Sequence, residues 1–139
     1  MDTVLQVQAE YSAAIQDTSR NTTAKLDLLL AGQAKEAFDT AFASAKTAGV
    51  IYKGTPPTAR IKVTSDQSSA SVPQVVLVNC PLQSQSDPFL AYYAASGKPV
   101  PVPTTAVKPP YAQTAKVFKV NGQWVVTQFS TDATKTCTS

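Results

Sequence analysis

Two cysteines are the residues whose types and positions most restrict the chemistry of this chain. Cys80 ends an apolar segment, and Cys137 lies close to the end of the sequence. Because the chain has no His, no second cysteine pair and no C-x-x-C motif, a soft metal site and a redox motif are both excluded. A structural disulfide between Cys80 and Cys137 fits best, since it would fasten a polar tail that has nothing to bury. Such bonds persist in oxidising compartments, so we expect an extracytoplasmic protein.

Acid–base chemistry has few candidate residues. Without His, a histidine general base, nucleophile partner or metal ligand is excluded. Six of the nine acids lie in residues 1–39, mostly off the apolar stripes, and no two carboxylates have a spacing that would pair them inside a cavity. We therefore predict no catalytic residue, no cofactor and no metal. A lone Asp with Tyr11 or Tyr52 leaves one alternative, a small-molecule isomerase or dehydratase acting on a carbonyl compound.

Four aromatic residues are candidates for a pocket or binding surface: Tyr11, Tyr52, Tyr92 and Trp124. Tyr92 and Tyr93 are neighbours on a predicted strand and point to opposite faces, so one belongs to the core and the other is exposed or lines a pocket. Trp124 is a candidate ligand platform, although a hairpin Trp beside Phe118 also suits a core position.

Basic residues are concentrated in the second part of the chain. Residues 1–39 hold six acids against three bases, a net of −3, and residues 40–139 hold three acids against nine bases, a net of +6. The stretch between Asp87 and Asp132 has no acid and contains four lysines: Lys98, Lys108, Lys116 and Lys119. These lysines are a candidate contact surface for an anionic partner, such as an envelope polymer, anionic lipid headgroups or nucleic acid. The alternative is a set of solvated lysines on strand faces and edges.

A proline-rich segment precedes the last strands. Residues 98–110 contain five prolines. Such a segment either presents a polyproline surface to a protein partner or blocks edge-to-edge aggregation of the sheet.

Helices and then strands must position these residues. Apolar stripes with helical spacing predict helices over residues 4–18, 25–32 and 33–49, the last two ending at Gly32 and Gly49. From there the hydrophobic period changes to two residues, which is typical of strands. Three helices followed by about six antiparallel strands predict one α+β domain over residues 1–139, with the helices packed on one face of a curved sheet.

The strands are predicted over residues 50–55, 59–65, 71–82 and 88–100 and on both sides of Asn121-Gly122. In the second of them Ala59, Ile61 and Val63 are expected to face inward. The third is almost continuously apolar, which suits a central strand covered on both faces.

The final turn at Asn121-Gly122 admits two registers. A two-residue type I′ loop sets Lys119 opposite Trp124. A three-residue loop sets Phe118 opposite Trp124 and so places both large aromatic side chains on one face. We prefer the three-residue loop for this reason.

The order of several short segments resembles a known family. The most specific are "VNC" at 78–80, "SGKPV" at 96–100, "NGQWVV" at 121–126 and "KTC" at 135–137. Together with "LDLLLAGQAKEAF" and "VIYKGTPPTARIKV", they make the chain from about Val4 to Cys137 similar to exported and lipoprotein-type NTF2-like domains of actinobacteria. The resemblance implies a cone of three helices against a strongly bent antiparallel sheet, a pocket inside it, and the Cys80–Cys137 disulfide.

The resemblance also implies an export signal or lipid anchor preceding Met1, so that contact with a membrane would depend on that anchor alone. We expect a non-catalytic extracytoplasmic binding domain that contacts a protein partner or a small apolar ligand. The alternative is a scaffold component of an envelope secretion or conjugation apparatus. The NTF2-like scaffold hosts enzymes and binding modules alike, so the resemblance implies no single activity.

Overall fold

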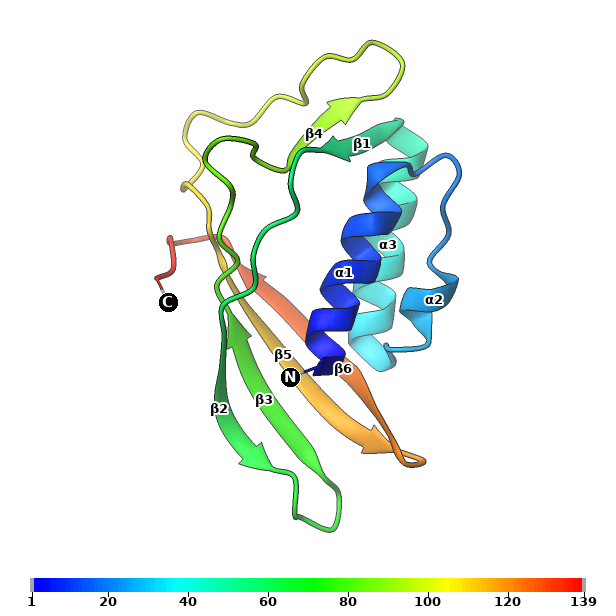
Figure 1. Ribbon diagram of the computed structural model, residues 1–139, viewed down its shortest axis with the longest axis vertical. Coiled ribbons are helices and arrows are strands. Elements are labelled where there is room, and N and C mark those ends of the chain that lie inside the picture. Colours follow the sequence, from blue (N-terminus) through cyan, green and yellow to red (C-terminus); the bar gives the residue numbers. More distant parts are fainter. Residues whose placement is uncertain (1, 139) are drawn as a thin grey trace.

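Three helices precede six antiparallel strands in the computed structural model, which describes residues 2–138 (Figure 1). The helices are α1 (Asp2–Gln16), α2 (Ala24–Asp27) and α3 (Gly32–Ala48). The strands are β1 (Val50–Lys53), β2 (Ile61–Gln67), β3 (Gln74–Asn79), β4 (Leu90–Tyr93), β5 (Ala112–Val120) and β6 (Gln123–Asp132). This order confirms the predicted α+β class.

The strands form two sheets, not the single curved sheet predicted from the sequence. β1 pairs with β4, and the larger sheet has the order β2-β3-β5-β6. Figure 1 shows the small sheet at the top, next to the end of α3, and the larger sheet below it. Pro56 and Pro57 lie between β1 and β2, and proline has no backbone N–H with which to continue a ladder. The chain therefore leaves one sheet there and enters the other.

α3 packs through one stripe of side chains, which contacts the larger sheet at Ala34 and Phe38 and packs with Ile15 and Phe89 at Phe42. Ala34, Phe38 and Phe42 are buried at four-residue spacing, which places them on one face of the helix. Gly49 ends α3 in the left-handed region with φ 68°, and its N–H bonds to carbonyl oxygens of the last turn. The helix predicted over residues 33–49 is thereby confirmed.

The second predicted helix is much shorter than expected. α2 has four residues, and the segment after it pairs with the edge of β6. Val126 donates its N–H to the carbonyl of Leu29 at 2.9 Å and accepts from the N–H of Ala31 at 2.9 Å. Gly32, with φ 55°, consequently begins α3 and does not stop a helix. The pairing covers a strand edge that would otherwise be free.

The β5–β6 hairpin has the two-residue loop, so the preferred three-residue register was wrong. Lys119 pairs with Trp124 and Phe118 with Val125, and both Asn121 and Gly122 have positive φ. Trp124 therefore lies on the face that packs against the core, with Phe118 on the other face. Farther along the hairpin, a bulge shifts the register between Lys116 and Val117. Because of this bulge, Phe129 of β6 also faces the core.

Only one face of the larger sheet is covered by helices. Within β3, Leu77 and Asn79 are buried, whereas Val76 and Val78 are half-buried. Val63 of β2 is 41% exposed. The prediction of a doubly covered strand was wrong. Val63 pairs with Leu77 and Ile61 packs against the core, so both point to the helix-covered face as predicted, but Val63 stays exposed because the helices contact mainly β6 and leave β2 at an open edge (Figure 1).

Candidate ligand-binding cleft

A cleft of about 450 Å³ lies between α1, α3 and the helix-covered face of the larger sheet. α1 and α3 form one wall, to which Ile15, Ala37, Phe38 and Ala41 contribute. This volume falls in the range of small-ligand sites, and the apolar side chains favour an apolar occupant.

The opposite wall comes from strand ends and loops. Phe129 of β6 packs on Phe38 with 4.8 Å between the ring centroids, which joins the two walls at the base of the cleft. Pro57, Pro81 and Phe89 complete the lining from the segments that connect the two sheets. These prolines and aromatic rings hold a rigid apolar surface, since they lose few rotamers when a ligand binds.

Tyr11 is the one predicted site residue that lines the cleft. Its ring meets Phe38 edge to face at 5.0 Å. Burial, and secondarily the nearby Tyr52, raise the pKa of Tyr11 to about 12. At neutral pH the hydroxyl is therefore protonated and available as a hydrogen-bond donor, and a phenolate base is not populated.

The polar side chains of the cleft are neutral: Gln8, Tyr11, Ser12, Gln113, Ser130 and Thr131. The described lining includes no Asp, Glu, Lys or Arg. A carboxylate general base is thus not among the residues that face this cleft. Its chemistry is that of hydrogen bonding within an apolar surface.

A chain of carboxamides reaches the cleft from the interior. The backbone N–H of Arg60 donates to Oδ1 of Asn79 at 2.9 Å, and Nδ2 of Asn79 donates to Oε1 of Gln113 at 3.0 Å. Nε2 of Gln8 donates to the same oxygen of Gln113 at 3.3 Å. Asn79 is only 3% exposed, so its bonds satisfy an amide that would be costly to bury alone. Residue spacing gave no signal for this assembly.

A second, shallower groove adjoins the cleft. It has a volume of about 420 Å³ and lies between α1 and residues 56–59. The two share Gln8, Ser12 and Pro57, so they meet beneath the same turns of α1.

The other predicted aromatic residues lie elsewhere. Tyr52 packs on Phe89 at 5.3 Å, behind the cleft lining. Tyr92 is half-buried on β4, with Nζ of Lys53 lying 5.4 Å from its ring centroid. Trp124 is half-buried and packs against the main core cluster. The structure therefore brings Tyr11 and Tyr52 together, and the described cleft lining includes neither Tyr92 nor Trp124.

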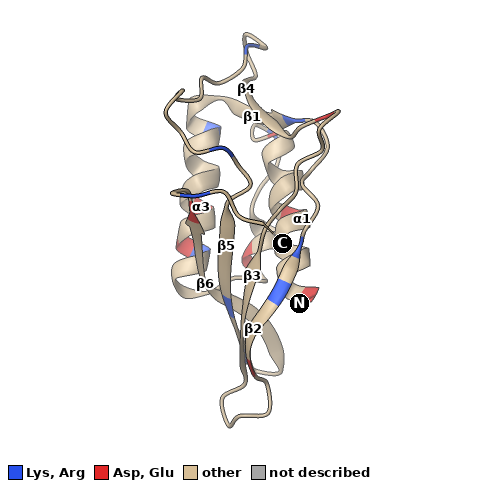
Figure 2. Ribbon diagram, turned by 90° about the vertical axis from the view of Figure 1, so that its left-hand side faces the viewer, with Lys and Arg blue, Asp and Glu red and all other residues tan. Residues whose placement is uncertain are grey.

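The four predicted lysines do not share one surface. Lys116 and Lys119 lie three residues apart on β5, and their side chains point to opposite faces of the sheet. Lys98 and Lys108 are exposed on the segment that connects β4 to β5. Figure 2 shows the basic positions spread along the length of the molecule.

The Cys80–Cys137 disulfide is present, as predicted. Its Cα atoms are 6.0 Å apart, and it ties the tail after β6 to the end of β3. The guanidinium of Arg60 donates to the carbonyl oxygen of Cys80 at 2.7 Å and to its Sγ at 3.2 Å. A structural disulfide is typical of proteins from oxidising compartments.

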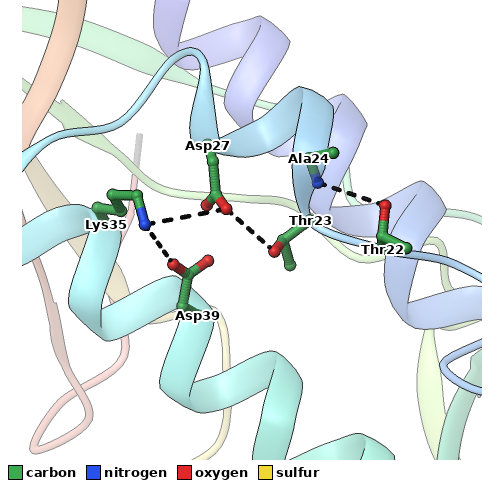
Figure 3. Close-up of polar contacts among 6 residues, drawn as sticks. All are labelled: Thr22, Thr23, Ala24, Asp27, Lys35 and Asp39. Carbon is green, nitrogen blue, oxygen red and sulfur yellow. Dashed lines mark hydrogen bonds and ion pairs between the residues drawn. The ribbon is translucent and has the colours of Figure 1, made fainter.

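Two carboxylates do meet, although the sequence indicated no such pair. Asp27 of α2 and Asp39 of α3 face each other beside Lys35 (Figure 3). Burial, followed by Asp39, raises the pKa of Asp27. Against the effect of burial, the pKa of Asp39 is lowered by Asp27, which can donate to Asp39 only in its protonated form, and by the hydrogen bond from Lys35. This pair is absent from the cleft lining, so it serves the packing of α2 on α3.

Residues 2–138 contain no cluster of three or more His, Cys, Asp or Glu side chains suited to a metal ion. Within the same range, every helix is too short or too polar to cross a membrane.

Comparison with known proteins gives a fold relationship. No protein-family model and no curated protein matches the chain. The structure is similar to the crystal structure of the intermembrane space region of the chloroplast protein ARC6, with a TM-score of 0.65 and 15% sequence identity. The match covers 96% of this chain and 93% of that one. At this identity the likeness concerns the fold alone, a small α+β domain of helices and antiparallel sheets.

Proposed function

We propose that this chain is a non-catalytic, extracytoplasmic NTF2-like domain that binds a small apolar ligand in the cleft between α1, α3 and the larger sheet. The observation that carries the proposal is the cleft of about 450 Å³, walled by Phe38, Phe129 and Phe89. Ligand sites commonly combine such apolar walls with a few placed polar groups. The disulfide supports export to an oxidising compartment, by secretion or on a lipid anchor.

Binding accounts for the cleft better than catalysis does. The titratable group that faces it, Tyr11, holds its proton at neutral pH. Proton abstraction from a carbonyl compound needs a base with a pKa near the working pH. The cleft instead offers neutral donors and acceptors, which orient a ligand and leave its bonds unchanged.

Displacement of the neutral fluorescent probe N-phenyl-1-naphthylamine tests the proposal. Ala41 lines the cleft from α3, yet the residue is exposed, so Ala41→Trp fills the cleft without disturbing the core. We expect the probe to bind the wild type and its affinity to fall by about tenfold or more in Ala41→Trp.

Ala43→Trp is the matched control, because Ala43 is exposed on the same helix and lines neither cleft nor groove. It should bind the probe as the wild type does. Equal affinities in the wild type and Ala41→Trp would refute a ligand site in this cleft.

A further inference from the structure

The polar end of the cleft holds carboxamides whose orientation is fixed by a backbone group. The N–H of Arg60 is only a donor, so the atom of Asn79 that it meets at 2.9 Å must be the oxygen Oδ1. The remaining half of this buried amide, Nδ2, must donate, and it meets Gln113 at 3.0 Å. Gln113 therefore presents Oε1 to Asn79 and turns its Nε2 elsewhere.

Gln8 bonds to the same oxygen of Gln113. Its Nε2 donates to Oε1 of Gln113 at 3.3 Å, which leaves Oε1 of Gln8 as an acceptor. Among residues 2–138, neither this oxygen nor Nε2 of Gln113 has a hydrogen-bond partner, and neither is a fully enclosed atom. Both side chains line the cleft. One free acceptor and one free donor thus stand on adjacent carboxamides in an otherwise largely apolar wall.

We propose that the cleft selects neutral ligands with an apolar body and one carboxamide group. The ligand N–H donates to Oε1 of Gln8, and its carbonyl accepts from Nε2 of Gln113. This inference rests on the proposed function and adds the ligand class to it.

Other polar groups match the pair less well. An ester has no donor for Gln8, and an alkylamine, which is protonated at neutral pH, has no acceptor for Gln113. A carboxylate would be buried without a cation, since the described lining holds no Lys or Arg. The carboxamide satisfies both free groups and carries no charge.

Competition among ligands with the same alkyl chain tests this class. Octanamide, methyl octanoate, octanoate and octylamine each displace N-phenyl-1-naphthylamine from the protein. We expect octanamide to bind about five- to tenfold more tightly than methyl octanoate, the effect of one added hydrogen bond to a group otherwise left unpaired. Equal affinities for the amide and the ester would overturn the inference.

The variant Gln113→Glu replaces the free donor by an acceptor and adds one negative charge. Its carboxylate still accepts from Asn79 and Gln8, but its second oxygen is an acceptor where Nε2 was a donor. Gln113→Glu should bind octanamide no more tightly than methyl octanoate. It should bind octylamine about tenfold more tightly than the wild type does. Gln128→Glu is the matched control, because Gln128 is exposed on β6 and adds the same charge outside the cleft.

A second variant tests the proposal even if Gln113→Glu does not fold. Gln8→Met removes the free acceptor and leaves the Asn79–Gln113 bond in place. The affinity of this variant for octanamide should be about fivefold lower than that of the wild type, and its affinity for methyl octanoate should be unchanged. An unchanged preference for octanamide in this variant would overturn the assignment of Gln8.

The two proposals fail in different ways. Failure of the probe to bind, or to respond to Ala41→Trp, refutes the ligand site itself. Probe binding that Ala41→Trp abolishes, with no preference for octanamide and no response to Gln113→Glu, retains the site and refutes the carboxamide class.

Discussion

Replacing Asp27 by Asn is expected to stabilise the protein at neutral pH. Asp27 and Asp39 share Lys35, whose Nζ lies 2.9 Å from Asp39 and 3.9 Å from Asp27. Among the described residues, one buried oxygen of each carboxyl group has no partner. An amide at position 27 keeps the acceptor for the Thr23 hydroxyl and offers an N–H to the unpaired oxygen of Asp39.

The expected gain combines a new hydrogen bond with the loss of a like-charge contact. One hydrogen bond contributes about 1 kcal/mol to stability. The side chains of Asp27 and Asp39 are 26% and 32% exposed, so water screens their repulsion and its removal adds only a few tenths of this amount. We therefore expect the free energy of unfolding to rise by about 1 kcal/mol at pH 7. With an m-value near 2 kcal/mol/M, the urea midpoint rises by about 0.5 M.

The gain should depend on pH in a defined direction. Because the pKa of Asp27 is raised on folding, the folded protein holds this proton more tightly than the unfolded chain does. Its contribution to stability is fully present below the unfolded value of 3.8 and is lost as pH rises through the folded pKa of Asp27. Asn has no proton to lose. The free energy of unfolding of Asp27→Asn should therefore exceed that of the wild type at pH 7 and equal it below pH 3.8.

Urea unfolding followed by the fluorescence of Trp124, the single Trp of the chain, measures this difference at both pH values. Asp39→Asn is the paired control. Asp39 has the closer contact with Lys35 and a lowered pKa, so its contribution is present at neutral pH and lost as pH falls. Asp39→Asn should thus destabilise the protein at pH 7. A loss of stability in Asp27→Asn at pH 7, or a gain that persists unchanged in acid, would refute this account of the pair.

Three further predictions concern other parts of the fold. Replacing Cys80 and Cys137 together by Ala should lower the free energy of unfolding by up to about 4 kcal/mol, because the bond spans 57 positions of the chain; the same urea assay measures it, and no change would contradict the role of the bond. Tyr11→Phe should remove a tyrosine that titrates near 12 from an alkaline absorbance titration, whereas removal of a group titrating near 10 would contradict its burial. Gly54→Ala should cost about 2 to 3 kcal/mol in thermal unfolding, because φ is 112° and the new Cβ would collide with the carbonyl of Pro88; a wild-type melting temperature would show that this segment adapts.

Local pattern determined much of the fold. The helical stripe of residues 33–49, with Gly49 at its end, needs only the side chains of one segment to decide which face is buried. The α+β class follows from the change of hydrophobic period after that glycine. The Cys80–Cys137 bond was predictable because the chain offers no other pairing of cysteines.

Tertiary structure decided everything that depends on distant segments. The hairpin register escaped prediction because the bulge in β6 lets Trp124 and Phe129 face the core while the turn keeps two residues. Leu29 and Leu30 read as helix, yet the open edge of β6 offered backbone partners that a helical pattern does not reveal.

The candidate site belongs to this second group. Gln8 and Gln113 are 105 positions apart, and Asp27 meets Asp39 only because α2 lies beside α3 (Figure 3). Residue types alone allowed Tyr11 as a pocket residue. Which donors and acceptors stay free depends on the bonds that each amide already makes. The Asn79–Gln113 bond forms when β3 pairs with β5, and the Gln8–Gln113 bond forms when α1 packs on the sheet.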